Sequence, residues 1–186
     1  MIEIQKLKRS DLTESELLRL TAGYTSNECY RIQREESDDS TTISLKLVQL
    51  DEPYVKRFEP DDDEEYDRYC RYVDLGMSLG VYEDGKLQGL ALTETVAWNK
   101  TLWIWEFHIA PHLHGQGLGR QMMEHVADLA KDAGLRVMVC ETQNTNVPAI
   151  RFYRKVGFVL DGIDLSYYSN DAVPMGEVAI FMKRHL

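Results

Sequence analysis

Long apolar runs are missing from this chain of 186 residues. A membrane-spanning helix needs roughly 20 consecutive apolar residues, and no stretch of the sequence approaches that length. The first residues, Met1-Ile2-Glu3-Ile4, also lack the basic and then apolar pattern of a signal peptide. We therefore expect a cytoplasmic protein with no membrane partner.

Cysteine is scarce, and its positions exclude two roles. Cys29, Cys70 and Cys140 fall in no CxxC or Cys/His spacing and leave an odd thiol in any disulfide scheme. We interpret them as reduced thiols. His108 and His112 have no third ligand at metal spacing, so we expect hydrogen-bonded structural histidines and no metal.

Basic residues are outnumbered: the sequence has 21 Lys and Arg against 31 Asp and Glu, a formal net charge of -10. A nucleic-acid-binding protein needs a basic face to neutralise phosphates, which excludes that class of partner. An acidic protein suits a cationic partner instead. Because the length fits one compact domain, we expect a single domain over residues 1–186 that acts as a monomer or a homodimer.

Alternating apolar residues and turn signals predict mainly strands in the first half of the chain. Thr13 and Glu16 form a capping box that should begin a helix. The acidic residues 59–67 are either a solvated loop or the lead into a helix, and the helical spacing around Tyr69 favours the helix. Asp84-Gly85 is a strong signal for a tight hairpin turn. Strands are expected over residues 1–7, Cys29–Arg34, Thr42–Leu50, Ser78–Tyr82, Leu87–Thr95 and Thr101–Ala110.

The second half of the chain alternates helices with strands, which after an antiparallel start predicts a mixed α/β sheet. The inward face of the first of these helices is apolar, with Leu118, Met122, Val126, Leu129 and Ala133 at helical spacing. The expected elements are helices over Leu118–Ala133 and Pro148–Val156, and strands over Arg136–Glu141, Leu160–Tyr168 and Glu177–Lys183.

A glycine-rich loop, His114-Gly115-Gln116-Gly117-Leu118-Gly119, lies between the strand that ends near Pro111 and the following helix. Glycine lets the backbone approach a ligand closely, and the start of a helix directs free N–H groups and a positive dipole at an anion. Such a loop can hold a pyrophosphate. A dinucleotide fold has a similar loop after its first strand, and a P-loop needs a Lys-Ser/Thr pair that is absent here.

The order of motifs around this loop resembles the GNAT superfamily of acetyltransferases. Ile109-Ala110-Pro111 precedes the loop, Asn146 follows the next strand, and Phe152-Tyr153-Arg154-Lys155-Val156-Gly157-Phe158 comes after that. Few other families share this order, and the resemblance extends from about Ser78 to the C-terminus. It implies a mixed, mainly antiparallel central sheet flanked by helices, with a splayed strand pair that binds acetyl-CoA.

Further motifs resemble the streptothricin (nourseothricin) acetyltransferases within that superfamily. They are Ala97-Trp98-Asn99, Glu141 to Asn146, Pro148-Ala149-Ile150, Gly162-Ile163-Asp164 to Tyr168, and the acidic residues 61–67. Two features depart from the pattern: His114 replaces the loop's leading Arg or Gln, and Trp105-Glu106 replaces an acidic pair on the central strand. The resemblance implies acetyl transfer from acetyl-CoA to a primary amine of a cationic small molecule, with the β-lysine group of streptothricin as acceptor.

The resemblance also assigns residues to acetyl-CoA, because in GNAT enzymes the central strand pairs with the pantetheine arm and the glycine loop holds the pyrophosphate. By position, Ile109 would direct an N–H group at the thioester oxygen. Asn146 would contact a pantetheine amide, unless it only forms a turn. The residues expected at acetyl-CoA are Phe107, His108, Ile109, His114, Gly115, Gln116, Gly117, Leu118, Gly119, Arg120, Asn146, Ala149 and Tyr153.

Three residues are candidates for the proton transfers of this reaction. Glu106 is the first candidate for the base, because it should share a strand face with His108 and Ala110 near the thioester. Glu141, on the neighbouring strand, is the second, and either carboxylate could instead only bind the substrate's charge or cap a backbone group. Tyr153 would protonate the departing thiolate, since a phenol has a pKa of about 10, and the alternative for it is a core aromatic.

The acceptor is expected to bind among acidic and aromatic residues, namely Asp61, Asp62, Asp63, Trp98, Trp105, Glu106, Glu141 and Asp164. Clustered carboxylates raise the local concentration of a cation, and the tryptophans either pack within strands or stack on a cation. Other acceptors stay open: a polyamine, an aminoglycoside or a protein amine. A noncatalytic acyl-CoA-binding module also stays open as an alternative function. A dinucleotide oxidoreductase is disfavoured, because the glycine loop follows a late strand rather than the first strand of the chain.

Overall fold

The computed structural model describes residues 1–21, 23–58, 63–173 and 176–186 of the chain. They belong to two compact units, each assembled from separate stretches of the sequence. The first unit comprises Met1–Ala22, Phe58–Cys140 and Arg184–Leu186, and the second comprises Gly23–Arg57 and Glu141–Lys183. Strands β7 (Val137–Gln143) and β9 (Ala179–His185) contribute residues to both units. The single domain over 1–186 stays a prediction.

The first unit contains most of the sheet, with the strands in the order β1-β4-β5-β6-β7. The bounds are Ile2–Lys6 for β1, Leu79–Glu83 for β4, Lys86–Val96 for β5 and Thr101–Ile109 for β6. Neighbouring strands are antiparallel from β1 to β6, whereas β6 and β7 are parallel. The predicted Asp84-Gly85 turn joins β4 to β5, with φ of 49° and 80° at its two residues.

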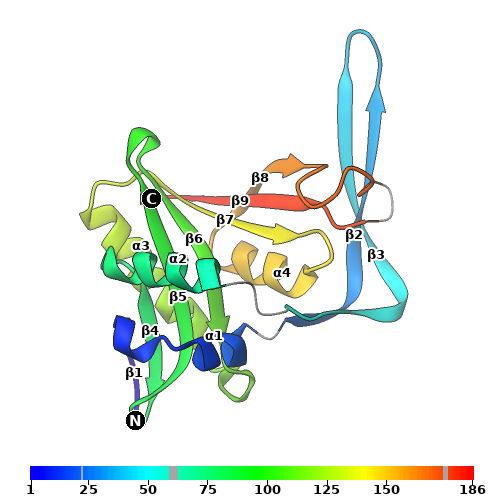
Figure 1. Cartoon of the computed structure of the whole chain (residues 1–186). Helices are drawn as coiled ribbons and strands as arrows, with labels where there is room; N and C mark the ends of the chain where they lie inside the picture. The colour runs from blue at the N-terminus through cyan, green and yellow to red at the C-terminus, as the bar shows by residue number, and fades with distance from the viewer. Residues whose placement is uncertain (22, 59–62, 174–175) are drawn as a thin grey trace. The chain divides into compact units, whose positions relative to one another are not determined.

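Helices pack on this sheet (Figure 1). Helix α1 (Glu14–Leu20) begins at the predicted cap, where Thr13 Oγ1 accepts a hydrogen bond from Glu16 N at 3.2 Å. Together with α2 (Asp63–Asp74), α1 forms one buried cluster with the β5 side chains Leu87, Leu90 and Leu92. Helix α3 (Leu118–Asp132) contacts β4 and β6. Three single-turn 3-10 helices lie at Arg9–Asp11, Ala97–Asn99 and Pro111–Leu113.

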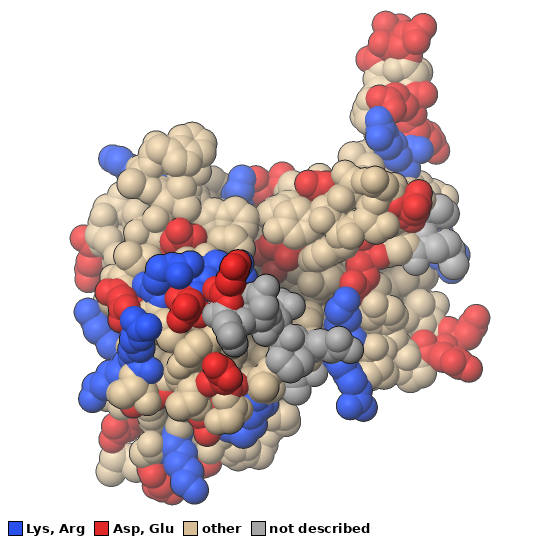
Figure 2. Space-filling model, viewed as in Figure 1, with Lys and Arg blue, Asp and Glu red and all other residues tan. Residues whose placement is uncertain are grey.

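The second unit contains a long hairpin of β2 (Tyr24–Glu36) and β3 (Thr41–Lys56). Both strands extend beyond the predicted ranges 29–34 and 42–50. Ile32 of β2 is buried with Ala172 and Val178, so contacts far along the chain support the hairpin. Acidic side chains gather at its tip, where residues 35–39 are exposed (Figure 2).

The second unit also contains α4 (Val147–Lys155) and the antiparallel pair β8 (Val159–Asp164) and β9. The prediction that the first of these strands reaches Tyr168 is wrong. Asp164 Oδ1 accepts a hydrogen bond from Ser166 N at 3.0 Å, and this local turn ends the strand. The mixed, mainly antiparallel sheet with flanking helices confirms the predicted fold class. Of the helices described, none is long and apolar enough to span a membrane.

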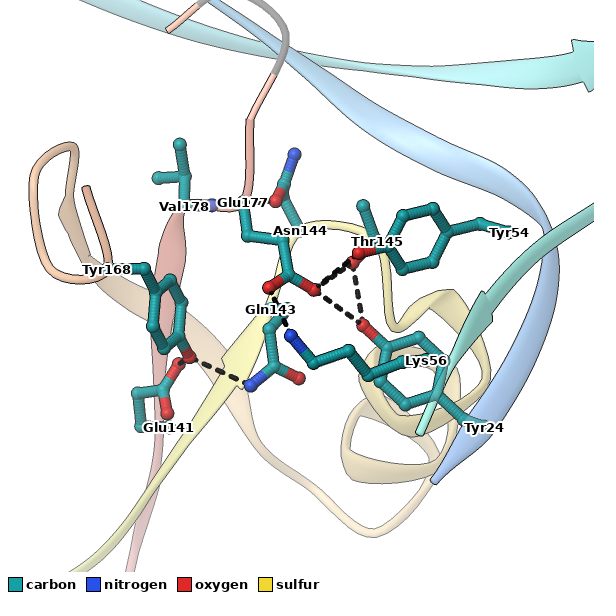
Figure 3. Close-up of polar contacts among 10 residues, drawn as sticks. All are labelled: Tyr24, Tyr54, Lys56, Glu141, Gln143, Asn144, Thr145, Tyr168, Glu177 and Val178. Atoms are coloured by element: carbon teal, nitrogen blue, oxygen red, sulfur yellow. Dashed lines mark hydrogen bonds and ion pairs between the residues drawn. The ribbon is translucent and has the colours of Figure 1, made fainter. Parts of the chain in front are cut away.

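The buried Asn144 and the partly buried Glu177 organise the second unit (Figure 3). Asn144 Nδ2 donates to the Tyr30 carbonyl at 2.9 Å, and Asn144 Oδ1 accepts from Val178 N at 2.8 Å. Glu177 accepts from the Tyr54 phenol at 2.9 Å and lies 2.7 Å from Lys56 Nζ. Burial raises the pKa of Tyr54 to about 12, and its bond to Glu177 acts in the same direction. These contacts join residues that lie far apart in the sequence of the second unit.

Replacing Asn144 with alanine should lower the free energy of unfolding by about 2–4 kcal/mol, because two buried backbone groups lose their partners. Urea denaturation followed by circular dichroism measures this change. Asn27→Ala is the matched control, since Asn27 is exposed on the β2–β3 hairpin of the same unit, and its effect should stay within about 0.5 kcal/mol. An equal decrease in the free energy of unfolding in the two variants would contradict a structural role for the Asn144 amide.

Candidate active site

Strand β6 contains a β-bulge at Trp105. Leu92 pairs with Glu106 and Thr93 pairs with Ile104, so Trp105 is the extra residue on β6. A bulge redirects the side chains that follow it. As a result, the side chains of the bulged residue and of the residue after it both face α2: Tyr72 stacks on Trp105 with ring centres 5.7 Å apart, and Tyr69 reaches Glu106.

Both carboxylate oxygens of Glu106 have a partner within the first unit. The Tyr69 phenol donates to Oε1 at 2.6 Å, and His108 Nε2 lies 2.7 Å from Oε2. The Glu106 and His108 side chains are each 22% exposed. The structure therefore brings the first candidate base and His108 together on one face. Sequence reasoning placed Tyr69 on a helix but did not identify it as the partner of Glu106.

Beyond Ile104 the pairing of β6 with β7 ends, and one edge of β6 turns away from β5. Ala110 N donates to the Gln88 carbonyl at 2.7 Å, which fixes the hydrogen-bonding phase between β5 and β6. Alternation along an antiparallel pair then turns the N–H and C=O groups of Phe107 and Ile109 away from β5. The parallel pairs with β7 run only from Thr101 to Ile104, so β6 continues past them. An extended ligand can pair with this edge.

Close packing holds β5 against β6 at this edge. Gly89 pairs with Ile109, and a Cβ atom added at Gly89 would lie 2.7 Å from the His108 carbonyl oxygen. No side chain fits there without separating the strands. On the open side, His114 Nε2 lies 2.7 Å from the Ile109 carbonyl oxygen, so the ring of the unusual His114 contacts the strand itself.

The glycine loop leads to a helix start that lacks a side-chain cap. Gly115 and Gly117 have φ of 78° and 81°, in the left-handed region that favours glycine. Gly117 is the N-cap of α3, and the first turn of the helix contains no acidic residue. Its first N–H groups have no intrahelical acceptor, and the helix dipole adds positive potential. The predicted pyrophosphate loop thus has the donors and the open space that an anion requires.

Three predicted residues of the second unit, Asn146, Ala149 and Tyr153, belong to α4 or its cap. Asn146 is the N-cap of this helix, and its Oδ1 accepts a hydrogen bond from Ala149 N at 3.2 Å. Tyr153 is buried, with its ring centre 5.5 Å from that of Phe152 and 5.3 Å from that of Phe158. Capping and core packing are therefore established for these side chains, and their roles toward acetyl-CoA stay predictions.

The second candidate base, Glu141, is joined to a tyrosine that the site prediction omitted. The Tyr168 phenol donates to Glu141 Oε1, and Gln143 Nε2 donates to the same phenol oxygen at 2.8 Å (Figure 3). Burial raises the pKa of Tyr168, and the negative charge of Glu141 raises it further. The Gly-x-Asp-x-x-x-Tyr motif contained this tyrosine, so the signal was present in the sequence.

The remaining predicted acceptor residues are dispersed. Trp98 is 86% exposed in the turn before β6, at the opposite end of that strand from Ile109. Asp61 and Asp62 lie outside the described residues, and Asp63 is the first residue of α2. His112 Nε2 lies 3.0 Å from Glu83 Oε2. Within the described part of the chain, no three His, Cys, Asp or Glu side chains gather as a metal site requires.

An open strand edge followed by an uncapped helix start suits a ligand that has an extended arm and phosphates. With this fold, such a site defines a coenzyme A-dependent acyltransferase. The model of the acetyltransferase (GNAT) family matches residues 44–158, and the chain belongs to this family. It is an acetyl-CoA-dependent N-acetyltransferase.

Named relatives agree with this assignment. A streptothricin acetyltransferase of Streptomyces lavendulae is 38% identical over 143 residues, covering 75% of both chains. The structure of a nourseothricin acetyltransferase matches with a TM-score of 0.75 and 28% identity, over 99% of this chain and 98% of that one. A Bacillus anthracis acetyltransferase solved in complex with acetyl coenzyme A shares the fold, with a TM-score of 0.75 and 21% identity over 100% and 99% of the chains.

Gly117→Asp should abolish acetyl-CoA binding while the protein stays folded. The new carboxylate can cap the first N–H groups of α3 and repels phosphate. Its Cβ has space, and the strain that a side chain causes at the positive φ is shared by the control below. Titration calorimetry measures the affinity. Gly134→Asp, at the other end of α3, is the matched control, because Gly134 also has a positive φ, of 70°, and open space. Wild-type affinity in folded Gly117→Asp would remove the loop from the site.

Proposed function

We propose that this enzyme transfers the acetyl group of acetyl-CoA to a primary amine of a polycationic small molecule, the β-lysine group of streptothricin-type antibiotics. The observation that carries the proposal is Glu106, a carboxylate held on both oxygens beside an open strand edge. It can bind an ammonium group and accept its proton. The relationship to streptothricin acetyltransferases supports this acceptor over a polyamine, an aminoglycoside or a protein amine.

The donor side of the proposal uses backbone groups of the first unit. The amides at the start of α3, with those of Gly115 and Gly117, bind the pyrophosphate. The Phe107 backbone pairs with the pantetheine arm. The Ile109 carbonyl already contacts His114, and the Ile109 N–H faces the thioester oxygen. Acetyl-CoA itself supplies an acetyl group activated as a thioester. Because these donors are fixed by the fold, they need no reorganisation during the reaction.

Proton transfers complete the proposed mechanism. Glu106 takes the proton of the bound ammonium, and the free amine then attacks the thioester carbonyl carbon. A C–N bond forms as the C–S bond breaks, Tyr153 gives its phenol proton to the departing sulfur, and the second proton of the attacking nitrogen restores the Tyr153 phenol. Glu141 belongs to the other unit, where its Oε1 accepts from the Tyr168 phenol. We assign Glu141 to binding the acceptor's positive charge.

The acidic character of the chain favours a polycationic acceptor. Asp61, Asp62 and Asp63 belong to the acidic run 59–67, in a protein with a formal charge of -10. Such a field raises the local concentration of cations and falls with ionic strength. In the proposal these carboxylates, with Asp164 and the exposed Trp98, steer the acceptor toward the site.

The acceptor is tested by measuring acetyl-CoA turnover with streptothricin, spermidine, an aminoglycoside and a lysine-containing peptide. We expect kcat/KM for streptothricin to exceed that of each other acceptor by about 100-fold, because a built site discriminates by differential binding in the transition state. Mass spectrometry of the product should show one acetyl group on β-lysine. A higher kcat/KM for any other acceptor would overturn the proposed substrate.

Tyr153→Phe should lower kcat by about 10²–10⁴-fold, because it keeps the buried ring but removes the proton that the thiolate needs. Acetyl-CoA affinity, measured by calorimetry, should change little. Tyr167→Phe serves as the control, since Tyr167 is exposed in the same unit and its hydroxyl has no part in the mechanism. Turnover at the wild-type rate in Tyr153→Phe would reduce Tyr153 to a core aromatic.

A further inference from the structure

An aromatic stack borders Glu106 on the α2 side of the first unit. The Tyr72 and Trp105 rings are nearly parallel, with an angle of 6° and centres 5.7 Å apart. Trp103 stacks on Trp105 with centres 5.2 Å apart. Trp105 is 38% exposed, and Trp103 is partly exposed, so the stack reaches the surface. Sequence analysis assigned Trp105 to the acceptor but did not identify the stack.

A second carboxylate lies on this stack. Trp105 Nε1 donates to Glu94 Oε2 at 3.0 Å, and Glu94 is the cross-strand partner of Trp103. Burial raises the pKa of Tyr72, and the negative charge of Glu94 adds to that rise, which places this charge next to the stack. Among the ion pairs of the described residues, none joins Glu94 to a lysine, arginine or histidine.

Glu94 and Glu106 are presented side by side by the sheet. Glu106 pairs with Leu92, which lies two residues from Glu94 on β5, and residues two apart on a strand share a face. Their backbone positions are therefore separated by about 7 Å along the strand. Between them stands Trp105, whose ring is part of the stack. The face thus alternates carboxylate, aromatic ring and carboxylate.

This arrangement has the chemistry of a site for two positive charges. An ammonium group is attracted both by a carboxylate and by the negative face of an aromatic ring. Partial burial strengthens both attractions, because less water competes for the cation. Glu94 joins no ion pair among the described residues, whereas Glu106 already contacts His108. The positive charges of Arg68 and Arg71 also act on Tyr72 of the stack.

We propose that Glu94, with Trp103 and Trp105, forms a subsite for a second ammonium group of the acceptor, next to the amine that Glu106 deprotonates. The proposal rests on the proposed function and extends it. β-Lysine carries two amino groups joined by a short aliphatic chain, and two carboxylates on one face of the sheet match such a pair. The subsite binds one amine and so selects which amine reaches the thioester.

Steady-state kinetics with streptothricin at saturating acetyl-CoA tests the subsite. Glu94→Gln should raise KM about tenfold, because a charged partner of an ammonium becomes neutral, and should leave kcat within about twofold. The amide oxygen can still accept from Trp105, so the stack should persist. Glu106→Gln should instead lower kcat. Asp128→Asn is the matched control, since it removes one charge from an exposed position on α3 and should leave both parameters unchanged.

The outcomes separate the two proposals. If wild-type enzyme acetylates streptothricin and Glu94→Gln behaves like Asp128→Asn, the subsite is overturned and the proposed function stands. If wild-type enzyme does not acetylate streptothricin, the proposed function fails, and calorimetric titration with spermidine decides the subsite. Weaker spermidine binding in Glu94→Gln than in Asp128→Asn supports it. Equal binding, or none to the wild-type protein, overturns it.

Discussion

The register of β6 on β5 is the constraint on which the site depends. Its one irregularity, the bulge at Trp105, places Glu106 opposite Leu92 rather than opposite Thr93. With regular pairing, the residue after Trp105 would point away from α2, and Tyr69 could not reach it. The hydrogen-bonding phase beyond the bulge also decides which backbone groups remain open at the strand edge. Side-chain chemistry and backbone chemistry are therefore fixed by the same register.

One strand can serve two ligands because its backbone and side chains point in different directions. Hydrogen-bonding groups of a strand lie in the plane of the sheet, whereas side chains stand roughly perpendicular to it. In the proposed mechanism the donor occupies the open edge of β6 and the acceptor occupies the face toward α2. The two substrates thus approach from directions about 90° apart, and neither needs the groups that bind the other.

Local signals gave most of the fold, because caps, turns and alternation act between residues close in sequence. Thr13 and Asp84-Gly85 were predicted correctly for this reason, as was the loop from Gly115 to Gly117. Strand ends were predicted less well: Ser166 bonds to Asp164 and ends β8 early. The partners of candidate residues were missed altogether, since the Tyr69–Glu106 contact joins residues 37 positions apart. Contacts between residues so far apart in the sequence depend on how the elements pack, and no single sequence motif predicts them.

Gly89 has a consequence for how mutational data on this enzyme should be read. Any side chain at this position would push against the His108 carbonyl and the Ile109 side chain, and would shift the strand edge that faces the donor. A saturation screen for resistance would therefore score Gly89 as intolerant, as it would a catalytic residue. Yet glycine contributes no reactive atom. Intolerance to substitution at such a position shows only that two backbones lie close together. A list of essential residues that included Gly89 would therefore contain a residue that takes no part in the chemistry.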